Sequence, residues 1–186
     1  MDDIFKCVEA LKAGGIILYP TDTVWCLGCD ATNDEAVRKI ITLKQSSDLV
    51  DMIVLVDHAD RIGRYIKQIP EVAIQLLEVN DKPMTIIYPG ALNLAPSLIA
   101  PDGSVAISIS GDDFCKKLIA AFNKPIVSSS ANLTGEPFPK IFREISEHIR
   151  TGADCIVKWR QNDPAPGAES SLIKVGLKGE VEIIRK

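Results

Sequence analysis

The sequence predicts a single α/β domain, residues 1–186, built around one large twisted mixed sheet. Three observations support this fold class. Short apolar runs of strand length alternate with segments of helical spacing, which is typical of α/β proteins. The last two strand-like runs are joined too tightly for a parallel crossover, so part of the sheet is expected to be antiparallel. The chain of 186 residues, 46% hydrophobic and 25% charged, is long enough for one core without disulfide or metal support.

Helix and strand alternate at the start of the chain. Residues 4–12 carry apolar side chains at helical spacing, and the Gly-Gly pair that follows is a helix-ending signal. Residues 16–19 form a continuous apolar run, which indicates a buried strand. The next helix is expected to begin after Thr32 or Asn33, because either side chain can cap it and two acidic residues then occupy its first turn.

The same criteria predict the remaining elements. Apolar runs indicate strands, and helical spacing after a capping residue or proline indicates helices. The expected strands are 52–56, 84–88, 105–109, 126–128, 155–158, 171–175 and 181–184. The expected helices are 59–65, 71–79, 113–122 and 142–149. The last two strands are predicted to form a hairpin around Lys178 and Gly179.

Composition argues against several classes of protein. The net charge of −4 and the pI near 5.2 disfavour broad electrostatic binding to nucleic acid. No apolar run approaches the ~20 residues of a membrane helix, and the acidic N-terminus is unlike a signal peptide, so we expect a cytoplasmic protein without membrane contact. Cys26 and Cys29 form a C-x-x-C pair without a second ligand pair, so we expect neither a metal nor a disulfide there.

Two hydroxyl-rich loops follow apolar strands. The segment SSSANLTGEP, residues 128–137, follows the short strand that ends near Val127, and PTDTVW, residues 20–25, follows the first strand. Small hydroxyl and amide groups around open backbone suit the binding of a polar small molecule or a phosphate at a strand end. We therefore expect the loop after Pro20 and residues 128–132 to line one cavity.

The chain resembles the YrdC-like threonylcarbamoyl-AMP synthase family over nearly its whole length. The pair P-T-D-T and S-A-N-x-[ST]-G-E-P is specific to this family. In chain order the matching segments are G-G-x-x-x-x-P-T-D-T-V-W from Gly14, Lys44-Gln45, Lys82-Pro83-Met84-Thr85, K-P-I-V running into SSSANLTGEP, Glu169-Ser170-Ser171 and Ile183-Ile184-Arg185. The resemblance implies a twisted sheet with a concave ligand-binding face.

The resemblance implies a reaction that joins L-threonine, bicarbonate and ATP into threonylcarbamoyl-AMP and pyrophosphate. ATP would enter with Mg²⁺, and no metal would be held by the protein itself. A partner system of tRNA-modification proteins would then move the threonylcarbamoyl group to an adenine of tRNA. The threonine-side residues implied are Thr21, Thr23, Ser128 and Ser170. The nucleotide-side residues implied are Lys44, Thr85, Ser130, Asn132 and Arg185.

Each of these residues also has an ordinary structural interpretation. Thr21 and Thr23 can stabilise a turn after Pro20, and Thr85 can be a plain strand residue. Lys44 can be a solvated residue at a helix end, where the helix dipole favours a cation. Arg185 can belong to a solvated chain end.

The sequence departs from the family pattern at two arginines. The pattern K-x-R-P becomes Lys44-Gln45-Ser46-Ser47, and V-A-V-R becomes residues 105–108 with Ser108 at its end. Serine provides neither the charge nor the reach of arginine, so losing one contact to a developing charge costs roughly a hundredfold in rate. Lys82, Arg160 or Lys174 is a candidate substitute.

Three functions are compatible with these residues. The first is a working threonylcarbamoyl-AMP synthase. The second is a divergent, catalytically impaired paralogue that binds nucleotide, tRNA or double-stranded RNA. The third is an unrelated small-molecule transferase on the same scaffold, because a fold does not fix a function.

Overall fold

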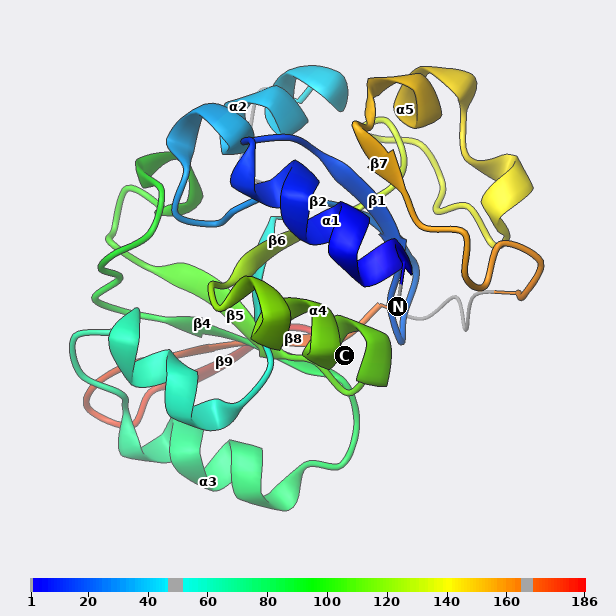
Figure 1. Cartoon of the computed structure of the whole chain (residues 1–186). Coiled ribbons are helices and arrows are strands. Elements are labelled where there is room, and N and C mark those ends of the chain that lie inside the picture. Colours follow the sequence, from blue (N-terminus) through cyan, green and yellow to red (C-terminus); the bar gives the residue numbers. More distant parts are fainter. Residues whose placement is uncertain (1, 47–51, 165–168) are drawn as a thin grey trace.

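A computed structural model describes residues 2–46, 52–164 and 169–186, which form one sheet flanked by helices (Figure 1). The strands are β1 Ile17–Pro20, β2 Trp25–Gly28, β3 Ile53–Val56, β4 Met84–Tyr88, β5 Val105–Ile109, β6 Ile126–Ser130, β7 Cys155–Ile156, β8 Ser171–Val175 and β9 Val181–Arg185. These described strands are ordered β7-β1-β2-β6-β3-β5-β4-β8-β9. Parallel pairs (β1 with β7, β3 with β5, β4 with β8) occur among antiparallel ones, so the predicted mixed α/β sheet is confirmed.

Within the described residues, two pairs of α-helices pack together, and the N-terminal helix also packs against the strands. The α-helices are α1 Asp2–Lys12, α2 Asp34–Leu43, α3 Glu71–Val79, α4 Asp113–Phe122 and α5 Glu147–Gly152, and the 3₁₀ helices are η1 Ala59–Arg64, η2 Pro96–Leu98 and η3 Phe142–Glu144. Helix α1 contacts α4, β1 and β7, and α2 contacts α5 (Figure 1). Asn33 caps α2 by accepting the Ala36 N–H at 3.2 Å, which is one of the two caps expected.

The register of the strands collects small hydroxyl residues on one face of the sheet. Thr85 pairs with Ser108, Ser108 with Leu55, and Leu55 with Ile126. Directly paired residues point to the same face, and so do residues two apart along a strand. Thr85, Ser108 and Ser128 therefore share one face, although they come from three different strands.

Strand β2 was not expected from the sequence. Residues 25–28 pair antiparallel with both β1 and β6, so the segment after Pro20 is a tight hairpin turn and not an open loop. The Thr21 N–H donates to the Val24 carbonyl at 3.3 Å and closes this turn. The signal for β2 was the apolar run that follows two threonines and an aspartate, which are frequent turn residues.

The predicted helix over residues 142–149 is wrong. Residues Phe142–Glu144 form a single 3₁₀ turn, Ile145 is extended, and α5 begins after Ser146. The Ser146 hydroxyl accepts the Ile149 N–H at 3.4 Å, so this serine caps a new helix where the periodicity suggested a continuous one. The segment expected as helix 59–65 is the 3₁₀ helix η1.

The C-terminal hairpin forms where the sequence predicted it. Strand β8 pairs antiparallel with β9, and Gly179 in the connection has a φ of +87°. Such a left-handed backbone is accessible to glycine at little cost. The hairpin brings Arg185 back beside the start of β8.

Among the described residues, no helix has both the length and the apolar character needed to span a membrane.

Candidate functional site

Two adjoining cavities open on the hydroxyl-bearing face of the sheet. The larger has a volume of about 260 Å³ and the smaller about 40 Å³. They share Thr23, Ile53, Ser128 and Ser170 in their walls. The predicted site residues that line one or both cavities are Thr21, Thr23, Thr85, Ser128, Ser130, Ser170 and Arg185. The segment after β1 and the end of β6, the two strand exits singled out in the sequence, therefore line the same cavities.

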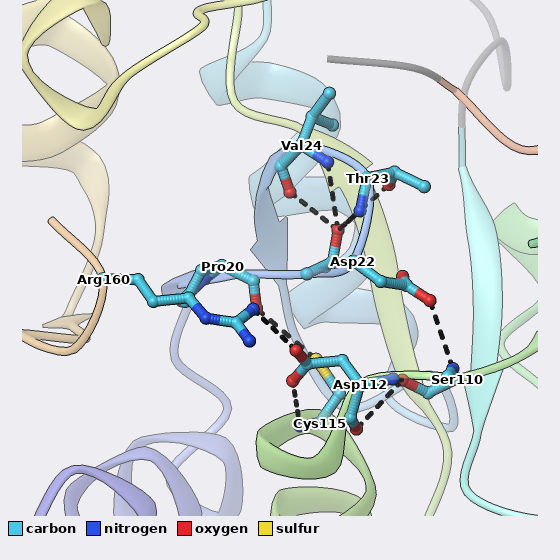
Figure 2. A network of polar contacts seen from close by, with 10 residues as sticks. Pro20, Asp22, Thr23, Val24, Ser110, Asp112, Cys115 and Arg160 are labelled. Atoms are coloured by element: carbon cyan, nitrogen blue, oxygen red, sulfur yellow. Dashed lines mark hydrogen bonds and ion pairs between the residues drawn. The ribbon is translucent and has the colours of Figure 1, made fainter. Parts of the chain in front are cut away.

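Thr21 organises the β1–β2 turn. Its Oγ1 donates to the Val24 carbonyl at 2.7 Å and accepts the Val24 N–H at 3.2 Å and the Thr23 N–H at 3.1 Å (Figure 2). Its side chain is buried, so its main contribution is the turn-stabilising one. Thr23, half-buried, lines both cavities and lies 3.0 Å from the Thr21 hydroxyl, Oγ1 to Oγ1.

Lys44 is buried behind the cavity wall and not solvated at a helix end. Only 2% of its surface is exposed, and its Nζ donates to the carbonyl of Ser130 and, at 3.3 Å, to its hydroxyl. The Lys44 carbonyl in turn accepts the Thr134 N–H at 3.1 Å. A buried ammonium is stable only where such acceptors replace water. Lys44 thus fixes the end of β6, whose Ser130 lines the larger cavity.

Asn132 lies beyond the cavity walls. Its Nδ2 donates to the Glu136 carbonyl at 2.7 Å, which closes the loop after β6. Its buried Oδ1 has no hydrogen-bond partner within the described residues. The expectation that residues 128–132 line the cavity holds for Ser128 and Ser130, while Asn132 shapes the loop behind them.

Ser170 and Arg185 close the site from the C-terminal hairpin. The Ser170 hydroxyl is 2.7 Å from the Thr85 Oγ1, so two predicted residues from opposite substrate sides are in direct contact. Arg185 donates through Nε to the Ser170 carbonyl at 3.1 Å and pairs through Nη1 with the Glu169 carboxylate at 2.6 Å. Arg185 is therefore a half-buried component of the larger cavity and not a solvated chain end.

The structure describes Ser108 and Ser46, the two serines at the arginine positions of the family pattern. Ser108 lines the smaller cavity, and its hydroxyl donates to the Met84 carbonyl at 3.0 Å. Ser46 is half-buried after α2, and its N–H donates to the Ile41 carbonyl at 3.1 Å. Ser47 lies outside the described residues.

The proposed substitutes for these arginines lie elsewhere. Arg160 pairs with Asp112 at 2.7 Å on the other side of the β1–β2 turn, and Lys174 pairs with Asp102 at 2.7 Å. Lys82 lines a neighbouring hollow that shares Asp22, Pro83 and Ile109 with the smaller cavity, but Lys82 does not line the smaller cavity itself. In the described part of the chain, Arg185 is the only lysine or arginine that lines either cavity.

Asp22 is a site residue that the sequence reasoning did not single out. It lies between the two turn threonines, lines the smaller cavity, and accepts the Gly111 N–H at 3.2 Å (Figure 2). Burial raises the pKa of its carboxyl group. A Cβ at position 111 would come within 2.7 Å of the Asp22 Oδ2, so a larger residue there would displace the Asp22 carboxylate from its present position. The signal was present in the P-T-D-T motif.

A polar network fixes the β1–β2 turn against α4. Asp112 caps α4 by accepting the Cys115 N–H at 3.0 Å, and its other carboxylate oxygen pairs with Arg160 (Figure 2). The Cys115 thiol donates to the Pro20 carbonyl at 3.4 Å. The start of α4 is thereby connected to the end of β1, which holds the turn in position.

The cysteines and histidines form no nucleophilic set among the described residues. The thiol of Cys26 lines the larger cavity, and burial raises its pKa to about 11, which keeps it protonated at neutral pH. Cys29, three residues on, is buried directly after β2, and its thiol donates to the Asp30 carbonyl at 3.8 Å. His58 pairs with Asp60, and His148 contacts the Leu43 carbonyl. No group of three or more metal-ligating side chains occurs within residues 2–46, 52–164 and 169–186.

Sequence comparisons relate the chain to threonylcarbamoyl-AMP synthases. The protein of that name from Photobacterium profundum is 32% identical over 161 residues, which cover 85% of this chain and 87% of that protein. The protein of that name from Chromohalobacter salexigens is 34% identical over 137 residues, covering 73% of this chain and 74% of that protein.

Solved structures share the fold. P. abyssi Sua5 in complex with L-threonine superposes with a TM-score of 0.84 at 25% identity, covering 92% of this chain. The chain spans about half of that Sua5 protein, 50% of its length. E. coli YciO superposes with a TM-score of 0.83 at 21% identity, covering 98% of this chain and 88% of YciO. A family model described as "Telomere recombination" matches residues 9–186, and the chain belongs to this Sua5/YciO/YrdC family.

Proposed function

We propose that this protein is a threonylcarbamoyl-AMP synthase, which makes threonylcarbamoyl-AMP and pyrophosphate from L-threonine, bicarbonate and ATP. The observation that carries the proposal is the meeting of Thr23, Ser128 and Ser170 with Arg185 in one cavity, in a chain whose curated relatives bear that name. The cavity offers hydroxyl groups for the polar groups of a small amino acid and one cation, Arg185, for phosphates.

The overall reaction sets two requirements on the site. The threonine ammonium first loses a proton to solvent, and its nitrogen then bonds to the bicarbonate carbon with loss of water. An oxygen of the resulting carbamate bonds to the α-phosphorus of ATP as pyrophosphate leaves. Neither step needs a covalent enzyme intermediate, so positioning and charge neutralisation are the main tasks. This agrees with a cavity whose thiol, Cys26, is protonated.

The residues lining the cavities suit these tasks. We propose that Thr23, Ser128 and Ser170 bind threonine, whose carboxylate and hydroxyl groups accept and donate hydrogen bonds. Arg185 and Lys44 would neutralise nucleotide phosphates, Lys44 from behind Ser130, where it fixes the cavity wall. Thr85, in contact with Ser170, would lie where the two substrates meet. Thr21 and Asn132 would act by holding the two loops.

ATP would bring Mg²⁺ on its phosphates, because Mg²⁺ is usually bound through substrate phosphates and a few protein oxygens. The carboxylates that line the cavities within the described residues are Asp22 and Glu169. The mixed anhydride of the product is reactive, so a partner system of tRNA-modification proteins would accept the threonylcarbamoyl group and transfer it to an adenine of tRNA.

Pyrophosphate release from ATP tests the proposal. We expect release to require both L-threonine and bicarbonate, and a Ser128→Ala, Ser170→Ala double variant to lose most of it. Lys174→Met, a change at a lysine paired with Asp102, provides a control expected to retain activity. Release that does not depend on threonine would contradict a synthase. Binding of ATP and threonine without release would instead support the impaired paralogue.

A further inference from the structure

The charge pattern of the two cavities assigns a role to Asp22. An amino-acid substrate carries a carboxylate and an ammonium group, and a partly desolvated ammonium needs an anionic partner. Among the described residues that line the cavities, only Asp22 and Glu169 are anionic. Glu169 is paired with Arg185 at 2.6 Å. Asp22 is therefore the carboxylate available to a cation.

The contacts of Asp22 do not include an ion pair within the described residues. Its Oδ2 accepts one backbone N–H, from Gly111, and no lysine or arginine pairs with it within the described residues. Arg160, whose charge acts on Asp22 and lowers its pKa, is bound to Asp112 at 2.7 Å. Lys82 lines a neighbouring hollow with Asp22 but forms no ion pair with it. Burial and the Asp112 charge raise the pKa of Asp22, as expected for a carboxylate without its counter-ion.

We propose that Asp22 binds the ammonium group of the amino-acid substrate, an inference that rests on the proposed function. The smaller cavity brings Asp22 together with Thr85, Ser108 and Ser128. An ammonium held at Asp22 leaves the substrate carboxylate and side chain within the hydroxyl-lined walls. The reacting nitrogen is thereby placed beside Ser108. The rest of threonine reaches Thr23, Ser128 and Ser170, which line both cavities.

The variant Asp22→Asn isolates the charge. Asparagine keeps an oxygen acceptor for the Gly111 N–H, so the turn is retained while the anion is removed. We expect L-threonine binding, measured by calorimetry, to weaken by at least about tenfold, with ATP binding unchanged within about twofold. Asp22→Glu keeps the charge and is expected to bind threonine more tightly than Asp22→Asn. Asp60→Asn, at an exposed aspartate in η1 that lines neither cavity, is the matched control.

A second ligand separates recognition from a structural effect. The 2-hydroxy analogue of threonine has the same carboxylate and side chain but no ammonium. The wild type should prefer threonine over this analogue, and Asp22→Asn should lose that preference. If the wild type binds threonine and Asp22→Asn binds it equally well with the same preference, the assignment of Asp22 is wrong. If the wild type binds neither threonine nor ATP, the proposed function fails and the assignment fails with it.

Discussion

Replacing Lys44 by methionine tests both functions assigned to this lysine. The change keeps an unbranched side chain, shorter by one atom, and removes the ammonium that donates to the carbonyl and the hydroxyl of Ser130. Because Lys44 is 2% exposed, water cannot take its place without rearrangement. The end of β6 should therefore be weakened, and the positive charge behind the larger cavity is lost.

The magnitude follows from the two kinds of contact. Leaving buried acceptors without a donor costs about 1–3 kcal/mol of stability. For a chain of this size each kcal/mol lowers Tm by about 2–4 °C, so a fall of about 2–12 °C is expected. If the Lys44 charge also stabilises the leaving pyrophosphate, threonine-dependent ATP turnover should fall by about a hundredfold or more.

The matched control is Lys174→Met. Lys174 forms a close ion pair with Asp102, but its side chain is 40% exposed and it lies outside both cavities. Such a surface pair contributes about 0–1 kcal/mol, so Tm and turnover should change little. Thermal melts and pyrophosphate release measure the two effects separately. A lower Tm with unchanged turnover would make Lys44 purely structural, and no change in either would refute the reasoning.

Three further predictions concern the cavity walls. Ser108→Arg should raise threonine-dependent turnover by about ten- to a hundredfold, because a charge-assisted contact is worth about 1.5–3 kcal/mol; unchanged turnover would show that this serine causes no deficit. Gly111→Ala should raise the KM for threonine, because its Cβ would lie 2.7 Å from the Asp22 carboxylate, whereas Gly63→Ala, with open space around it, should not; equal KM values would count against this contact. Threonine binding should weaken as pH falls through the raised pKa of Asp22, because the carboxylate loses its charge there. The charges of Asp112 and Arg160 also act on this carboxylate. If Asp22→Asn shows the same loss of binding at low pH, Asp112 or Arg160 and not Asp22 is its cause.

Most of the sheet could be predicted from the sequence, because buried strands in α/β proteins consist of nearly continuous runs of apolar residues. Residues 84–88 and 105–109 match β4 and β5 residue for residue. Strand β2 was missed because its residues directly follow a two-threonine turn, and the hydroxyl groups suggested a loop. The continuous helix over 142–149 was wrong because Ser146 starts a new one. In both cases a side chain that competes for backbone hydrogen bonds decided the local structure.

The candidate site was predictable in outline, but the partners of its side chains were not. The strand exits indicated that the loop after Pro20 and residues 128–132 would line one cavity. Thr23 and Ser128 do line the same cavities, but Asn132 does not. The burial of Lys44 against Ser130 depends on a contact between residues 86 positions apart, which no local pattern encodes. The same holds for Asp22 and Gly111, which are 89 positions apart.

The charge balance of the cavities explains why Ser108 matters for the proposed reaction. Within the described residues, Arg185 is the only cation in the cavity walls, and Glu169 already neutralises much of its charge at 2.6 Å. In the proposed reaction, a triphosphate would have to displace the Glu169 carboxylate from Arg185. Lys44 would contribute its positive charge from behind Ser130. An arginine at position 108 would add a cation in the wall of the smaller cavity, where the carbamate forms in the proposed scheme. Because position 108 is a serine, hydroxyl groups in that wall are left to stabilise the negative charge that develops on the carbamate, and they do so less than a guanidinium would.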